Sequence, residues 1–241
     1  VSLKNNYFEV PGFDAGSPTA DVVNNIKQLT YEAIIRVNNF KTDEFPKKDI
    51  ATIMGIEQYC LFRIGDAGFP LQQLQFSSPG ENKFPNADTG KLLQPSEWYH
   101  VAVVYDTEKK TAVIYVDGRE QSRIEDYGNG EPVNLGKQTR GSDFMFKIGH
   151  SYGEPDYMER QLDGEICEVR VWNVARSQQE IFDNMYNIED PANTPGLQAY
   201  WKFNEGEGDI AKDYTRHGND AKSYAKATWP TGIEVTQKNK E

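Results

Sequence analysis

Cysteine and histidine are scarce in this sequence, with two and three occurrences in 241 residues. Two cysteines cannot build the disulfide framework on which small secreted domains depend. Cys60 and Cys167 both lie in apolar, strand-like stretches, which favours buried thiols over a single bridge between strands. His100, His150 and His217 do not show a zinc-binding spacing. We expect His100, in the middle of a strand pattern, to be a packed and hydrogen-bonded side chain.

Long apolar runs and an excess of basic residues are also missing. No stretch approaches the roughly 20 apolar residues that span a bilayer, so we expect no membrane insertion by this segment. The net charge of −11 argues against binding to nucleic acid or to an anionic membrane surface. A neutral or cationic partner, or a neutral polymer such as a glycan, is compatible with this charge. The chain begins at Val1 without a signal-like segment, and we expect a fragment whose targeting signal lies outside it.

Several catalytic signatures are absent as well. The sequence has no G-x-S-x-G elbow, no phosphate-cradling glycine loop and no C-x-x-C pair. What it has in abundance is short, apolar stretches separated by Gly, Pro, Asn and Asp. This punctuation predicts an all-β sandwich or barrel formed by one domain over residues 1–241, with a polar tail at about 235–241.

One short helix interrupts the strand pattern. Ser177 and Glu180 have the spacing of a capping box, and Ile181 and Met185 form one apolar stripe. We therefore predict a helix near 177–187.

Three segments taken together carry a family resemblance. They are EWYHVAVVYDTEKKTAVIYVDGRE (97–120), LDGEICEVRVWNVARSQQEI (162–181) and LQAYWKFNEGEGDIAKDYTRHGND (197–220). In this order they resemble the laminin-G-like branch of concanavalin-A-like jelly rolls. The segment TIMGIEQYCLFRIGDAGFPLQQLQF (52–76) is similar to laminin-G-like domains of secreted and cell-surface Bacteroidetes proteins. The resemblance implies a two-sheet antiparallel jelly-roll sandwich, in which one of the two stacked sheets is concave, and a non-catalytic binding role.

An acidic run supports an opposing, enzymatic hypothesis. Asp163, Glu165 and Glu168 form D-x-E-x-x-E, whereas jelly-roll glycoside hydrolases resembling laminarinases use E-x-D-x-x-E. Retaining hydrolysis needs two carboxyl groups about 5 Å apart. In an unbulged strand Glu165 and Glu168 would point to opposite faces, so we expect no catalysis by this run.

The C-terminal loop KDYTRHGNDA is the candidate metal site. Asp213 and Asn219 are the oxygen-bearing residues that we predict to bind a structural calcium, with Asp220 beside them. The alternative is a loop whose Asp and Asn side chains hydrogen-bond their own backbone.

Glycan recognition needs exposed aromatic faces beside fixed polar groups. Loop positions supply the predicted ligand-binding residues, and Trp98, Trp172 and Trp201 are expected in the core because they lie in strand patterns. Trp229 is compatible with either place. The predicted ligand-binding residues are Tyr152, Tyr157, Arg160, Asp126, Tyr127 and Gln72, with Phe69 beside the last.

We therefore expect a non-catalytic carbohydrate-binding or adhesion module, secreted or displayed at a bacterial surface, that targets a glycan-degrading or surface partner to a polysaccharide or glycoconjugate. A protein-interaction domain is the first alternative. A jelly-roll glycoside hydrolase is the second.

Overall fold

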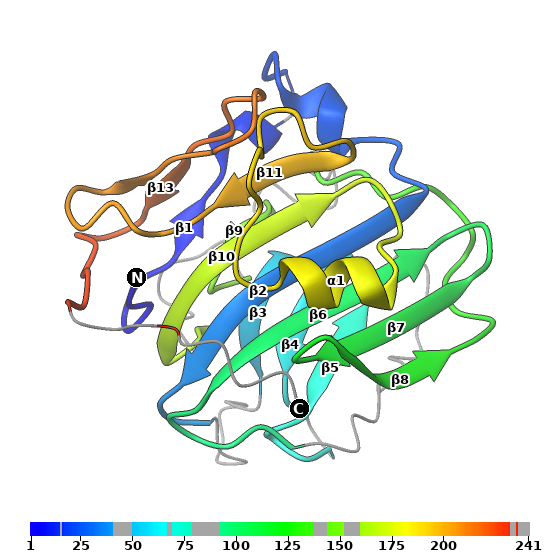
Figure 1. Ribbon diagram of the computed structural model, residues 1–241, viewed down its shortest axis with the longest axis horizontal. Helices are drawn as coiled ribbons and strands as arrows, with labels where there is room; N and C mark the ends of the chain where they lie inside the picture. Colours follow the sequence, from blue (N-terminus) through cyan, green and yellow to red (C-terminus); the bar gives the residue numbers. More distant parts are fainter. Residues whose placement is uncertain are drawn as a thin grey trace.

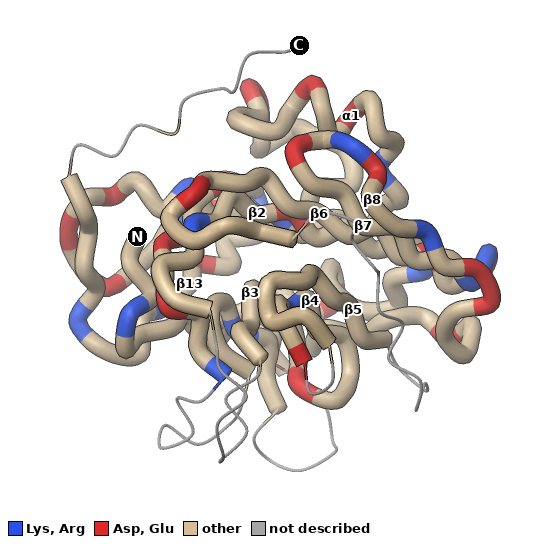
Figure 2. The backbone as a smooth tube through the Cα atoms, turned by 90° about the horizontal axis from the view of Figure 1, so that it is seen from below, with Lys and Arg blue, Asp and Glu red and all other residues tan. Residues whose placement is uncertain are grey.

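The computed structural model describes residues 1–14, 16–40, 50–66, 69–78, 92–136, 144–151, 160–231 and 235. Within these ranges the strands form two antiparallel sheets that lie face to face (Figures 1 and 2). The first is a six-stranded sheet, ordered β11 (Leu197–Trp201), β10 (Gly164–Trp172), β2 (Gln28–Val37), β6 (Trp98–Asp106), β7 (Thr111–Val116) and β8 (Arg119–Ile124).

The second is a seven-stranded sheet. Its order over the described residues is β12 (Ile210–Ala211), β13 (Ala221–Ser223), β1 (Phe8–Glu9), β9 (Lys147–Ile148), β3 (Ala51–Ile56), β4 (Cys60–Ile64) and β5 (Leu74–Ser77). Two short 3-10 turns, Pro11–Phe13 and Ala20–Val23, lie between β1 and β2. The prediction of an all-β, two-sheet jelly-roll sandwich is confirmed.

The core lies between the sheets because each strand alternates its side chains. In β2, Leu29, Tyr31 and Ala33 belong to the main hydrophobic cluster, which extends along the chain from Val1 to Ala227. The intervening residues Thr30 and Glu32 therefore point to the outer face of the six-stranded sheet. Trp172 and Trp201 are buried as expected. Both cysteines are free thiols, and Cys60 is buried while Cys167 is only half-buried.

The helix α1 (Gln178–Asn184) lies across the outer face of the six-stranded sheet (Figure 1). The capping box is present as predicted, because the Ser177 hydroxyl accepts from the backbone N–H of Glu180 and the Glu180 carboxylate accepts from that of Ser177. Ile181 then packs into a second apolar cluster with Val104 and Tyr115 of the sheet. The helix therefore covers the part of this outer face that β6 and β7 form.

β8 is a strand that the sequence pattern does not single out, because REQSRI is mostly polar; in the structure its residues are exposed or half-buried. It pairs with β7 at the edge of the six-stranded sheet. Such an edge strand has neither the apolar alternation nor the β-branched composition by which strands are recognised.

Candidate functional site

A β-bulge in β10 determines where the acidic residues of this strand point. Cys167 pairs with Ile34 and Arg170 pairs with Glu32, so three residues of β10 span the length of two residues of β2. Glu168 lies within this bulge and has a positive φ of 53°. Because a bulge of this kind breaks the alternation of side chains, Glu168 is brought to the same face as Glu165.

This placement corrects the sequence-based expectation that Glu165 and Glu168 point to opposite faces. That expectation assumed a regular strand. Both residues instead line one pocket of about 300 Å³ on the outer face of the six-stranded sheet, beside α1. Cys167 and Ile34, which are paired across the sheet, lie in the same wall.

Aromatic side chains from three separate segments surround the pocket. Trp98 begins β6, Tyr186 follows α1, and Trp229 lies beyond β13; each is half-buried. The guanidinium of Arg36 lies 5.2 Å from the centre of the Trp98 ring, and the Trp229 indole donates to the carbonyl of Gly208 at 2.9 Å. Trp98 is therefore a lining residue of the pocket, which corrects its expected place in the core.

The polar groups of the pocket are held in fixed positions. Glu165 accepts from Nε of Arg36 at 2.9 Å and from Nδ2 of Asn38 at 3.3 Å. Glu168 accepts from the Arg170 guanidinium at 2.7 Å and from the Tyr200 hydroxyl. Lys202, Phe203, Asn204 and Gly206 form the opposite wall, which follows β11 in the chain.

A buried charge cluster connects the pocket to α1. Glu32 is fully buried and accepts from Arg176 at 2.7 Å and from Arg170 at 3.4 Å, and its other neighbour is Nε2 of His100 at 3.1 Å. Arg170 also donates to the carbonyls of Asn184 and Met185 at the C-terminal end of α1, at 2.8 and 3.2 Å. Arg170 therefore holds both Glu168 and the segment that carries Tyr186.

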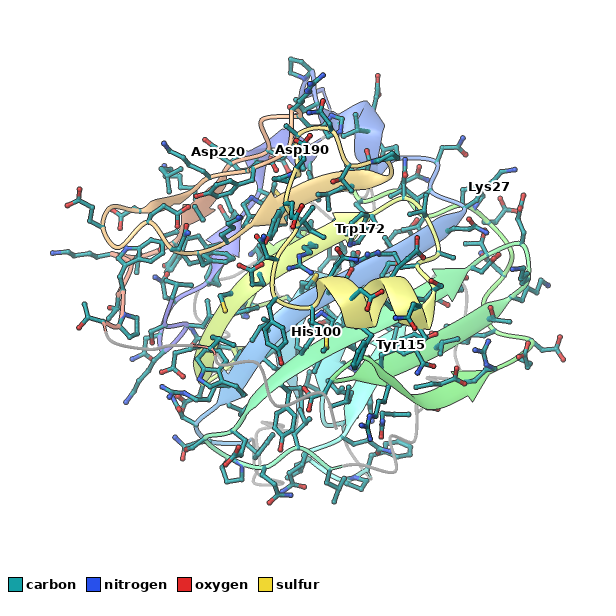
Figure 3. All side chains as sticks on the ribbon, viewed as in Figure 1. Lys27, His100, Tyr115, Trp172, Asp190 and Asp220 are labelled. Carbon is teal, nitrogen blue, oxygen red and sulfur yellow. The ribbon has the colours of Figure 1, made fainter. Side chains whose placement is uncertain are left out.

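Burial in this cluster raises the pKa of Glu32, but the hydrogen bond from His100 and the charges of Arg170 and Arg176 outweigh it and set the pKa at about 2. His100 is buried and hydrogen-bonded, as the sequence analysis predicted. In the view of Figure 3, His100 and Tyr115 are labelled below α1, and Trp172 is labelled above it.

The predicted ligand-binding residues lie elsewhere. Arg160 donates to Glu57, the residue after β3 of the seven-stranded sheet, at 3.1 Å. Gln72 precedes β5 of the same sheet, and its carbonyl accepts from Leu93. Tyr152 and Tyr157 fall outside the described residues.

Tyr127 is a correction, because it lies in the core and not at an exposed rim. Its side chain is 3% exposed, its ring packs against those of Phe76 and Tyr105, and its hydroxyl donates to the carbonyl of Phe76 at 3.1 Å. Its neighbour Asp126 is exposed and has a positive φ of 55°, which is typical of a turn residue.

Asp213 and Asn219, the predicted calcium ligands, lie in the loop between β12 and β13, and Asp213 forms a β-bridge with Trp201 of β11. The Asp213 carboxylate accepts four protein hydrogen bonds: from the backbone of Tyr200, Thr215 and Asn219, at 3.1, 3.0 and 2.9 Å, and from the Thr215 hydroxyl at 2.7 Å. Asn219 is fully buried, and its side-chain amide has no partner among the described residues.

In this arrangement Asp213 acts as a structural acceptor, and a calcium ion would compete with four donors for it. No group of three acidic, cysteine or histidine side chains that could hold a metal is present in the part of the chain that the structure describes. Calcium binding stays a prediction.

The pocket is not evident from the sequence because its lining comes from distant parts of the chain. Trp98 had one usable signal, since it alternates with Tyr99 and therefore faces away from the core that Tyr99 joins. The bulge at Glu168 gave none, because Glu168 is neither Gly nor Asn, the residues that favour a positive φ.

The comparisons with known proteins agree with this architecture. A family model described as the concanavalin A-like lectin/glucanases superfamily matches residues 12–182. The chain belongs to this superfamily. No curated protein sequence matches the chain.

Among solved structures, a protein from Bacteroides ovatus ATCC 8483 that has been proposed to bind carbohydrate superimposes with a TM-score of 0.74 at 30% identity. The match covers 98% of this chain and 61% of that one, so this chain spans about three fifths of the length of the other. The CBM40 domain of the Ruminococcus gnavus IT-sialidase gives a TM-score of 0.50 at 14% identity, over 76% of this chain and 94% of the domain.

A structure of NanB with optactamide gives a TM-score of 0.51 at 15% identity, over 80% of this chain and 28% of NanB. At these identities the last two matches show the shared fold alone. Within the described residues, no helix has the length and apolar character needed to cross a membrane.

Proposed function

We propose that this chain is a non-catalytic carbohydrate-binding or adhesion module and that glycan binds in the pocket lined by Trp98, Tyr186 and Trp229. The observation that carries the proposal is the meeting of three half-buried aromatic side chains with fixed polar groups. Aromatic rings present apolar faces to the C–H groups of a sugar, and oriented polar groups bind its hydroxyls.

The size of the pocket is consistent with a short piece of glycan. Its volume of about 300 Å³ is at the lower end of small-ligand clefts. Its walls include the carboxylate of Glu168 and the amide of Asn204, so polar groups are present beside the aromatic faces.

The Bacteroides ovatus neighbour supports the same class of function. We extend the proposal to a secreted or surface-displayed bacterial protein in which this module targets a glycan-degrading or surface partner. Tethering of this kind raises the effective concentration of the partner at its polymer.

A glycan-cleaving activity is the second candidate, because Glu165 and Glu168 line the same pocket. Each of them, however, already accepts a hydrogen bond from a guanidinium group, at 2.9 Å from Arg36 and 2.7 Å from Arg170. Hydrolysis requires one of the two carboxyl groups to deliver a proton to the leaving group. These ion pairs fit two permanent acceptors better than an acid and a nucleophile.

The experiment is a glycan-array screen of the purified chain, with calcium and again with chelator, followed by calorimetry on the strongest ligand. Trp98→Ala should weaken binding at least about tenfold, the effect of losing about 1.4 kcal/mol from a central aromatic contact. The matched control is Tyr224→Ala, which removes an aromatic that is 48% exposed and lies outside the pocket.

Three other outcomes would change the proposal. Loss of binding with Tyr157→Ala, and not with Trp98→Ala, would move the site to the loop that the sequence analysis predicted. Release of reducing ends from a bound oligosaccharide, abolished by Glu168→Gln, would make the chain an enzyme. A blank array under both conditions would refute glycan binding and turn the search to protein partners.

A further inference from the structure

We infer that the pocket selects neutral glycans and rejects glycans that carry carboxylate or sulfate groups. This inference rests on the proposed function and concerns the same pocket. It follows from which charged groups face the pocket and from which of them already have partners.

Glu168 presents an available acceptor. Its Oε2 accepts from Arg170 at 2.7 Å and from the Tyr200 hydroxyl, while Oε1 has no hydrogen-bond partner among the described residues. The bulge and these contacts fix the carboxylate in the pocket wall. A sugar hydroxyl that donates to Oε1 would form a charge-assisted hydrogen bond, which is shorter and stronger than one to a neutral acceptor.

Glu165 places a second carboxylate in the same wall. It is held by Arg36 and Asn38, and its side chain is 10% exposed. A carboxylate oxygen has two lone pairs, so each Glu165 oxygen keeps capacity for one more donor. Hydroxyl groups of a neutral sugar are donors of this kind, whereas a second carboxylate would meet like charge.

The cations near the pocket already have partners within the protein. The Lys202 ammonium donates to Asn187 at 3.1 Å and lies 5.4 and 5.1 Å from the ring centres of Tyr200 and Tyr214. The Arg170 side chain is fully buried. Neither is presented as the open fork with which Arg recognises carboxylate or sulfate.

One further cation completes the surroundings. Arg36 lies over the Trp98 ring and is paired with Glu165. The described groups therefore offer the ligand acceptors without a cationic clamp.

The test compares neutral oligosaccharides, namely xylo-, manno- and arabino-oligosaccharides, with oligogalacturonate, sialyllactose and sulfated oligosaccharides. We expect binding only within the neutral set, with little change between low and high salt. Glu168→Gln keeps a carbonyl oxygen for Arg170 and should weaken neutral binding about tenfold or more, because a neutral acceptor replaces a charged one. Glu125→Gln, an exposed carboxylate outside the pocket, is the matched control.

The outcomes separate this inference from the proposed function. Anionic glycans that bind the wild type and are lost in Trp98→Ala would overturn the neutral preference and leave the pocket as the binding site. Neutral binding that Glu168→Gln leaves unchanged would overturn the role of this carboxylate. If no glycan of either set binds, the proposed function fails, and the inference fails with it.

Discussion

Replacing Glu32 by glutamine should destabilise the protein more than any surface charge substitution. Glu32 is fully buried under α1 and is the shared partner of Arg170 and Arg176, at 3.4 and 2.7 Å. Glutamine has nearly the same shape but no charge. The variant would therefore leave two guanidinium groups, neither more than 6% exposed, without their central counter-ion.

The size of the effect follows from the ion pairs of Glu32 and from its pKa. Removing one partner of a buried ion pair costs about 3–5 kcal/mol, and Arg170 keeps Glu168, so we expect about 3 kcal/mol. The lowered pKa of Glu32 gives a similar value. A pKa of about 2 in the folded protein against 4.5 for the free group corresponds to about 3 kcal/mol in favour of the folded, ionised state.

Urea unfolding followed by tryptophan fluorescence measures this loss, which should lower the midpoint by about 1 M or more. The control is Glu108→Gln. Glu108 pairs with Lys27 at 2.8 Å, but both side chains are more than half exposed, so solvent screens the pair and we expect little or no loss of stability. If Glu32→Gln is no more destabilising than this control, the account of the cluster is wrong.

The pH dependence provides an independent check. Because the pKa of Glu32 is depressed in the folded state, its contribution is complete above about pH 4.5 and is lost as the pH falls through about 2. The difference in stability between wild type and Glu32→Gln should therefore narrow from pH 4.5 downward. A difference that stays constant over this range would refute the assignment.

Two further predictions concern Cys167 and Asp213. Burial raises the pKa of both cysteine thiols to about 12, but Cys60 is fully buried whereas Cys167 lines the pocket. Iodoacetamide at pH 9 should therefore label Cys167 faster than Cys60, and a bound glycan should slow the labelling of Cys167. Peptide mass spectrometry measures both rates, and equal Cys167 rates with and without glycan would contradict the pocket as the binding site. Asp213→Ala removes an acceptor of four hydrogen bonds and should lower the free energy of unfolding by about 2 kcal/mol, in calcium and in EGTA alike. Thermal unfolding measures this change, and a loss of stability seen only with calcium would make Asp213 a calcium ligand.

Local sequence predicted those features of the fold that depend on neighbouring residues. The alternation of apolar side chains in 98–106 and 111–116 marked a hairpin, and these segments are β6 and β7. The capping box at Ser177 likewise specified where α1 begins, because its hydrogen bonds join residues three apart. β8 escaped notice because an edge strand is not required to be apolar.

The candidate site was not predictable in the same way. Tyr127 was expected at an exposed rim because it lies in a Gly-rich loop, yet the sandwich closes over it and buries its ring against Phe76 and Tyr105. Trp98 was expected in the core because its strand is apolar on both faces, yet α1 covers only part of the outer face.

The sequence by itself determined most of the strand segments, the helix, the all-β class of the fold and the lack of a disulfide framework, because composition and periodicity act over a few residues. The tertiary structure alone decided that Glu165 and Glu168 share a face, since the bulge depends on how β10 pairs with β2. It also brought Trp98, Tyr186 and Trp229 together. Such contacts join segments that are far apart in the chain, and no local pattern specifies them.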